Sequence, residues 1–260
     1  MVRTLFLVGI VAAALLLLAP FAAAQTPSGV LGPVNALGQE VTRPPAPTGP
    51  APRLPDGTID LGDGIWVSSP YTPETGPRLG EVLLLPAAKA LMASRKTTDD
   101  PLAWCLPMGV ARYTPYPFRF IQDQTHRKPT HLYILHETMR AFRQVFMDGR
   151  THPAELDPTW FGHSIGSYEK DTLVIDTVGF NDKAWFDNRG MPHTEQLHTV
   201  ERWTRVDAGH LATEVRIDDP GTFSRPFTVT FQSTLGQPGD ELMEYVCNEN
   251  NQYGIASGVK

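Results

Sequence analysis

The sequence has little of what marks a metal-binding or nucleic-acid-binding protein. It contains two cysteines, Cys105 and Cys247, and neither belongs to a CxxC pair, so no cysteine-based metal site is expected. Basic residues are neither in excess nor clustered, since 22 lysines and arginines stand against 28 aspartates and glutamates. This balance argues against binding to nucleic acid or to an anionic membrane surface.

The N-terminal residues have the pattern of a secretory signal peptide. Arg3 precedes an apolar run over residues 5–19, and alanines at positions 22–24 precede Gln25. This order predicts a signal peptide over residues 1–24. The apolar run is shorter than the roughly 20 residues that a membrane-spanning helix needs. We therefore expect a periplasmic or secreted protein with no membrane span after cleavage.

An oxidising compartment changes the expectation for the cysteines. An even count in an exported chain favours one disulfide, here between Cys105 and Cys247. Two buried free thiols are the alternative.

The distribution of proline suggests the domain organisation. Prolines crowd between residues 44 and 55, and such a density favours extended backbone over packed structure. We expect residues 25–55 to form a disordered tether and residues 56–260 to form a single β-rich domain. The one convincing helix is PAAKALMASRK, which begins at Pro86. Leu91 and Met92 are expected to pack inward and Arg95 to face water.

Short strand patterns separated by turn residues dominate the rest of the chain. Apolar and polar residues alternate within them, which predicts a sheet with one buried face. Some eight or nine antiparallel strands joined by hairpins favour a lipocalin-like meander barrel, because closure removes exposed edges. A two-sheet sandwich is the alternative. Candidate strands cover residues 65–67, 118–122, 131–136, 141–147, 163–168, 172–178, 198–205, 211–218, 227–235 and 242–247.

Two catalytic motifs are approximated but lack their usual context. The sequence around Ser164 fits the GxSxG of a serine hydrolase, yet that motif needs a helix after the serine and a strand pattern follows here. The sequence after His136 begins like the zinc motif HExxH but has Arg140 at the second histidine position. A serine hydrolase is therefore only a minor alternative, and a zinc site on this motif is not expected.

Charged residues inside apolar strands are better candidates for function. Asp176 interrupts an apolar strand, Glu137 ends another, and Arg143 lies among apolar neighbours. A charge taken from water is costly unless it is paired. These groups are expected either to pair inside the protein or to line a cavity with shifted pKa values.

The segment at residues 180–193 is the best candidate for a binding loop. It joins two strands with more residues than a hairpin needs, and long loops in compact domains are often functional. Trp185 and Phe186 can cover an apolar ligand, with Asn181 beside it. Asp187 can orient His193 as an acid or base. A surface loop held by aromatic packing is the alternative.

A metal site near this loop is not expected. His193, His198 and Glu201 are possible ligands by type. On a strand, however, His198 and Glu201 lie an odd number of residues apart and face opposite sides of the sheet. We therefore expect no metal and no cofactor.

Several motifs taken together resemble an uncharacterised family of exported bacterial proteins. They are DG followed by DL at residues 56–61, GxSxG, EKDTLVIDT, GFN, LHxxER and EYVCNEN, and they extend over most of the chain after the signal. Two positions depart from the pattern: Tyr168 stands where tryptophan is usual, and Lys170 where glycine closes the turn. The resemblance implies export, and it implies no particular activity.

The preferred hypothesis is a barrel that binds a small apolar or aromatic molecule at its mouth. The rival is a cofactor-independent lyase or isomerase acting on such a molecule by acid–base chemistry. A structural envelope protein is a further alternative. Predicted catalytic residues are His193, Asp187, Glu137 and Arg143, and predicted ligand-binding residues are Asp176, Asn181, Trp185, Phe186, His198 and Arg202.

Overall fold

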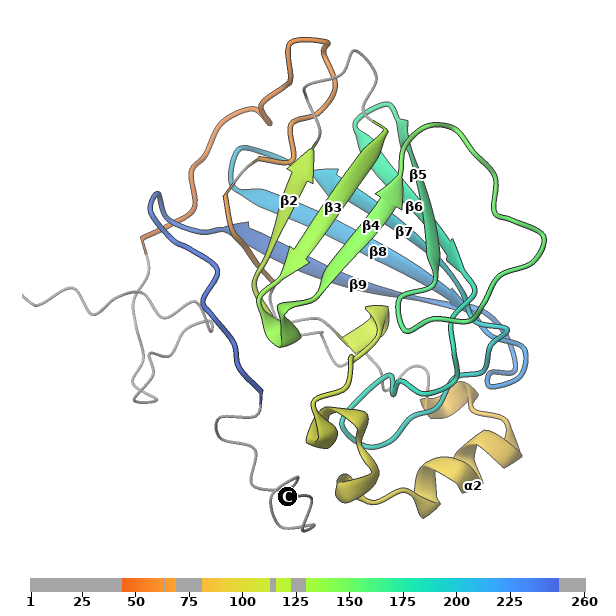
Figure 1. Ribbon diagram of the computed structural model, residues 1–260. Coiled ribbons are helices and arrows are strands. Elements are labelled where there is room, and N and C mark those ends of the chain that lie inside the picture. The colour runs from red at the N-terminus through yellow and green to blue at the C-terminus, as the bar shows by residue number, and fades with distance from the viewer. Residues whose placement is uncertain (1–43, 63, 69–80, 113–115, 123–129, 248–260) are drawn as a thin grey trace, which may run out of the picture.

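Nine strands close into one barrel, in chain order from β1 to β9 (Figure 1). The computed structural model describes residues 44–62, 64–68, 81–112, 116–122 and 130–247. The predicted all-β barrel is confirmed. The strands are β1 (Trp66–Ser68), β2 (Phe118–Gln122), β3 (His131–His136), β4 (Phe142–Phe146), β5 (His163–Glu169), β6 (Thr172–Val178), β7 (His198–Arg205), β8 (His210–Asp218) and β9 (Phe227–Leu235).

One neighbouring pair of strands departs from the expected hairpin meander. β4 and β5 are parallel, whereas every other neighbouring pair, including β9 with β1, is antiparallel. A closed ring with an odd number of strands cannot alternate direction at every step, so one parallel pair is required. A parallel pair also needs a long return connection. Residues 147–162 provide it as a wide loop beside the barrel (Figure 1).

The turn between β5 and β6 is tight although a lysine stands where glycine is usual. Glu169 pairs with Thr172, which leaves only Lys170 and Asp171 in the turn. Lys170 has φ of +56°, in the left-handed region that two-residue hairpins favour and that costs an L-residue energy. The hairpin therefore keeps its geometry at the expense of backbone strain in one residue.

A helical layer lies at one end of the barrel, below it in Figure 1. It contains α2 (Pro86–Ser94) and the 3₁₀ helices η1 (Thr97–Asp99), η2 (Pro101–Trp104) and η3 (Val110–Arg112), while η4 (Thr138–Arg140) joins β3 to β4. None of these helices has the length and apolarity that would let it cross a membrane, within the part of the chain that the structure describes.

The orientation predicted for α2 was partly wrong. Ala88 is its buried residue and Met92 packs against the core, but Leu91 is 47% exposed. Arg95 was expected in water, yet it lies beyond the end of the helix in extended backbone. From there its guanidinium stacks over the Trp185 ring, with a separation of 5.1 Å, and donates to the carbonyl of Gly190.

The C-terminal segment predicted as a strand at residues 242–247 does not join the sheet. It runs beside the barrel to its helical end instead (Figure 1), where Cys247 forms the predicted disulfide with Cys105. The backbone N–H of Met243 donates to the carboxylate of Glu137 at 2.9 Å. Both contacts tie the segment to the rest of the protein without sheet pairing.

Residues 44–55, predicted as part of the tether, follow the barrel surface. The carbonyl of Gly49 accepts from the N–H of Ala208, and Arg53 forms an ion pair with Asp171 at 2.7 Å. The predicted signal peptide and the tether up to residue 43 lie outside the described residues.

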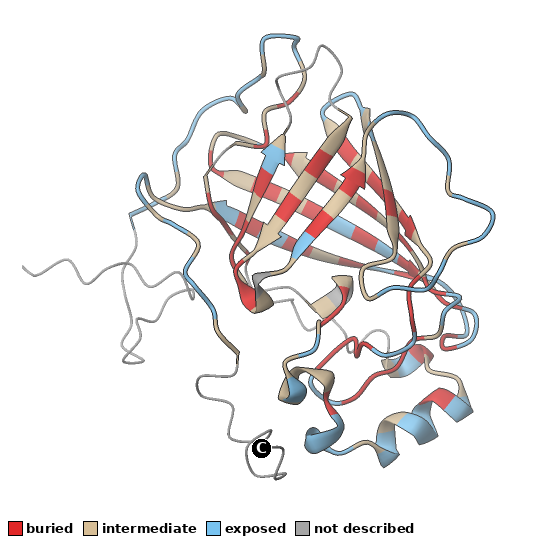
Figure 2. Cartoon of the chain, viewed as in Figure 1, coloured by how far each residue is buried: buried red, intermediate tan, exposed pale blue. Residues whose placement is uncertain are grey.

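The strands alternate buried and partly exposed side chains, as their sequences predicted (Figure 2). Four inward aromatic rings meet edge to face at the centre of the barrel, with centroids 5.5–5.7 Å apart. They come from three different parts of the sheet: Phe118 and Phe120 from β2, Trp203 from β7 and Phe231 from β9. The interior is thus packed around these rings rather than open along its length.

Candidate functional site

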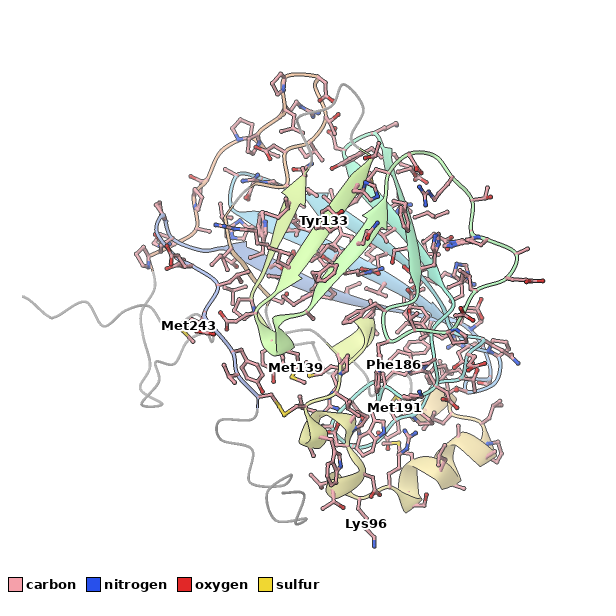
Figure 3. All side chains as sticks on the ribbon, viewed as in Figure 1. Lys96, Tyr133, Met139, Phe186, Met191 and Met243 are labelled. Atoms are coloured by element: carbon pink, nitrogen blue, oxygen red, sulfur yellow. A yellow bond between two sulfur atoms is a disulfide. The ribbon has the colours of Figure 1, made fainter. Side chains whose placement is uncertain are left out.

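A cavity of about 50 Å³ lies inside the barrel next to the aromatic cluster. Most of its wall is apolar and includes Phe118, Trp203 and Phe231. Phe186 and Met191, from the loop at residues 179–197, close it at the helical end, and Figure 3 shows both between the barrel and α2. The predicted binding loop therefore contributes to the cavity.

An ion pair is enclosed in the cavity wall. Arg143 on β4 and Glu201 on β7 are 3% and 2% exposed, and Nη1 of Arg143 lies 2.6 Å from Oε1 of Glu201. The other carboxylate oxygen accepts from the indole N–H of Trp203 at 3.0 Å. The guanidinium also donates to Ser164 at 3.0 Å and to Thr177 at 2.6 Å. Arg143 is thus paired inside the protein, which was one of the two expectations for it, and it also lines the cavity.

A row of hydroxyl side chains crosses three strands beside this pair. Ser164 on β5 is the register partner of Thr177 on β6, which is the partner of Thr199 on β7. The first two hydroxyls are hydrogen-bonded to each other at 2.9 Å. Thr199 lines the cavity and is 1% exposed, but its hydroxyl has no hydrogen-bond partner. A buried hydroxyl without a partner is costly, and each such group needs an explanation.

His136, at the end of β3, lines the same cavity. Burial lowers its pKa to about 3, and the positive charge of Arg143 acts in the same direction. The imidazole is therefore neutral at ordinary pH. Among the described residues that line the cavity, only Arg143 and Glu201 carry a charge, and these two cancel.

A second, smaller cavity of about 10 Å³ lies under the loop and includes His193 and Trp185 in its wall. Thr199 and Val110 line both cavities. His193, predicted as an acid or base in the binding loop, is 7% exposed, with the ring of Phe186 packed against it. Burial lowers its pKa, although a hydrogen bond to the carbonyl of Thr194 opposes the shift.

Asp187 has a different contact from the one predicted for it. Its carboxylate binds the Arg189 guanidinium and accepts from the backbone N–H groups of Arg189 and Met191. These bonds stabilise the loop that carries Phe186 and Met191. The hydrogen bond described for His193 is to Thr194, not to Asp187.

Asn181 and Glu137 also support the backbone. The side-chain oxygen of Asn181 accepts from the N–H of Lys183 at 3.1 Å and turns the loop as it leaves β6. Glu137 is 5% exposed, and its carboxylate holds Met243 at the helical end. Burial raises the pKa of Glu137, while the bond from Met243 opposes that rise. Neither side chain is part of the described cavity wall.

Asp176, His198 and Arg202 lie on the outer face of the barrel. Oδ1 of Asp176 lies 2.9 Å from Nε2 of His198 and 3.1 Å from Nε2 of His152, whose other ring nitrogen contacts His163 at 2.8 Å. Arg202 pairs with Glu169 in an exposed contact. The structure therefore separates these three residues from Arg143 and Phe186, which line the main cavity.

The polar cavity residues that the sequence interpretation missed are Glu201, Thr199 and His136. The signal for the first two was present, because Thr199, Glu201 and Trp203 alternate along one strand face and the tryptophan marks that face as buried. His136 was considered only as part of a metal motif. His136 lies in the cavity because β2 and β3 pair in a register that places it opposite Phe118. The sequence of one strand alone does not reveal that register.

Within the described residues, no group of three or more histidine, cysteine, aspartate or glutamate side chains is arranged to hold a metal ion. Comparison of the chain with protein-family models, with curated proteins and with solved structures finds no match.

Proposed function

We propose that this protein is an exported carrier or receptor that binds a small, largely apolar or aromatic molecule inside its barrel. The observation that supports this most is the mixed cavity wall, in which aromatic side chains surround a buried ion pair and an unpartnered Thr199 hydroxyl. Ligand pockets are commonly built in this way, with a few polar groups in an apolar lining.

The size of the cavity limits the ligand. A cavity of about 50 Å³ is smaller than the roughly 150 Å³ of an engineered cavity that binds benzene. A molecule of a few non-hydrogen atoms fits the cavity as it stands. A ring would enter after Phe186 or Met191 withdraws, and both side chains lie on the loop rather than on a strand. The loop is thus the part of the wall that would adapt to a larger ligand.

Export rests on two separate features. The signal-peptide pattern at residues 1–24 is a feature of the sequence, and the disulfide between Cys105 and Cys247 is a feature of the structure. Disulfides persist in oxidising compartments such as the periplasm and the extracellular space. Both support a periplasmic or secreted protein.

Native mass spectrometry of the exported protein, purified with its disulfide intact, tests the proposal. We expect a non-covalent small-molecule adduct that denaturation releases for identification. Val215→Phe, which adds a ring within the cavity wall, should abolish the adduct. Val200→Phe makes the same change on the outer face of β7 and should keep it. Identical adducts in both variants, or no adduct together with no thermal shift by small apolar compounds, would contradict binding inside the barrel.

Catalysis is a second candidate, supported by the neutral imidazole of His136 beside the positive charge of Arg143. The neutral imidazole can hydrogen-bond a reacting group and the guanidinium can stabilise developing negative charge, as a lyase or isomerase reaction needs. Incubation of the released ligand with wild type and with His136→Gln separates the two functions. Turnover that the substitution abolishes, with binding retained, would indicate an enzyme. If wild type does not convert the ligand, the protein is a carrier and not an enzyme.

A further inference from the structure

We infer that the ligand of this cavity is uncharged and carries a hydrogen-bond-accepting oxygen, such as the carbonyl of an amide, aldehyde or ketone. This inference rests on the proposed binding function and names the chemical class of its ligand. The oxygen would accept from Arg143, and a polar atom of the same head group would bond to the Thr199 hydroxyl.

The first argument is the charge balance of the wall. Arg143 and Glu201 form an ion pair at 2.6 Å and are almost fully buried, so each charge is already neutralised by the other. A charged ligand would bring a third charge into this enclosed site with no opposite charge left for it. Burying an unpaired charge is far more costly than burying a neutral polar group that is hydrogen-bonded. An anion or a cation is therefore excluded by the same pair that makes the site polar.

The second argument is the number of donors that remain. A guanidinium has five N–H groups. Hydrogen bonds to Ser164 and Thr177 use two of those on Arg143, and Nη1 also lies against Oε1 of Glu201, an oxygen that has no hydrogen-bond partner. The remaining N–H groups can only donate, so their partner on the ligand must be an acceptor. Because Arg143 lines the cavity, a ligand oxygen can supply that acceptor.

The third argument is the position of Thr199. It is the cross-strand partner of Thr177 and the inward neighbour of Glu201 two residues along β7. Side chains in such positions lie about 5 Å and about 7 Å apart. Both neighbours contact the Arg143 guanidinium. The unpartnered hydroxyl and the remaining N–H groups of Arg143 therefore belong to the same polar corner of an otherwise apolar cavity.

This arrangement matches one head group. The carbonyl oxygen of a neutral molecule has two lone pairs and can accept from an N–H of Arg143. The Thr199 hydroxyl can donate or accept, so it can bond either to the oxygen or to the N–H group of an amide. The hydrocarbon part then occupies the aromatic wall formed by Phe118, Trp203 and Phe231. A pure hydrocarbon would fill the wall but would leave the hydroxyl of Thr199 unsatisfied.

Matched pairs of probes test the inference on the full exported protein. Isobutyramide and isobutyrate have the same shape but differ in charge, as do the larger benzamide and benzoate, and toluene is the apolar control. Binding is measured at neutral pH by ligand-observed NMR and by thermal shift. We expect at least one amide to bind at least tenfold more tightly than its carboxylate.

Each outcome decides between the two proposals. A carboxylate that binds as well as its amide would overturn the uncharged ligand class while leaving a binding barrel intact. The same holds if toluene binds and neither amide does. If none of the five compounds binds, the proposed function itself fails.

A pair of substitutions tests the role of the hydroxyl. Thr199→Val removes the unpartnered hydroxyl and nearly keeps the shape, so we expect a higher melting temperature but at least fivefold weaker amide binding. Thr213→Val is the matched control, because Thr213 is also 1% exposed with an unpartnered hydroxyl but lies outside the described cavity wall. It should raise the melting temperature and leave amide binding unchanged. Full amide affinity in Thr199→Val would overturn the assigned contact.

Discussion

Arg143 and Glu201 connect two strands of the barrel that are not neighbours, since β5 and β6 lie between β4 and β7, and their side chains meet at 2.6 Å inside it. Each charge depends on the other, because neither is exposed by more than 3%. The pair therefore fixes the interior geometry while it places donors at the cavity.

Removal of one partner should strongly destabilise the fold. Arg143→Met leaves the carboxylate of Glu201 buried without a cation, and we expect a loss of about 3–5 kcal/mol in the free energy of unfolding. The double variant Arg143→Met with Glu201→Leu should recover most of that loss, since a hydrophobic replacement of a buried pair is often neutral. Urea denaturation of the single and double variants measures the difference. A double variant as unstable as the single one would show that the pair itself is not the source of the cost.

The sequence predicted the barrel and the interior position of Arg143 but not the partner of Arg143. Strand patterns are local, and alternation reports which residues share a face, as for Glu201 and Trp203. The contact between Arg143 on β4 and Glu201 on β7 depends on how the barrel closes and on the parallel pairing of β4 with β5. Neither feature can be predicted from the sequence of one strand. Asp176 shows the converse limit. Because Asp176 is a charged residue within an apolar strand, it was expected in the interior. Its side chain instead points outward and contacts two histidines on the outer face of the barrel.

The buried imidazole of His136 should make stability fall with acidification. Its pKa is about 3 in the folded protein and about 6.5 when exposed, so the unfolded chain binds a proton first as the pH falls. The free energy of unfolding is therefore unaffected by this residue above pH 6.5, and it falls progressively between pH 6.5 and pH 3. From pH 7 to pH 5 we expect a loss of about 2 kcal/mol from this residue.

Urea denaturation at the two pH values, in wild type and in His136→Gln, isolates this contribution. The difference between the two pH values should shrink by about 2 kcal/mol in the variant, whatever its absolute stability. His210→Gln, which removes a partly exposed histidine on the outside of β8, should keep most of the wild-type fall. An equally steep fall in His136→Gln would show that other groups cause it.

The disulfide should stabilise the helical end of the barrel. Cys105 and Cys247 are 142 residues apart, and removal of a native disulfide from a small secreted domain typically costs about 2–5 kcal/mol. The double variant Cys105→Ser with Cys247→Ser should melt at a lower temperature than wild type, and reductant should lower the wild type to a similar value. Reductant should have no effect on the double variant. An unchanged melting temperature in both experiments would mean that the other contacts of the segment, among them that of Met243 with Glu137, are sufficient to hold it.

Lys170 offers a substitution that should increase stability. It occupies the left-handed region at φ of +56°, which costs an L-residue about 1–2 kcal/mol, whereas glycine adopts this conformation freely. Lys170→Gly removes that strain but loses more entropy on folding, so we expect a net gain of about 0.5–1 kcal/mol. Gly149→Ala is the inverse control, because Gly149 has φ of +81° and an added Cβ would meet no atom within 4 Å. It should destabilise through the backbone alone. Both substitutions could lower the melting temperature. In that case the lysine side chain would stabilise the hairpin by more than the strained backbone of Lys170 destabilises it.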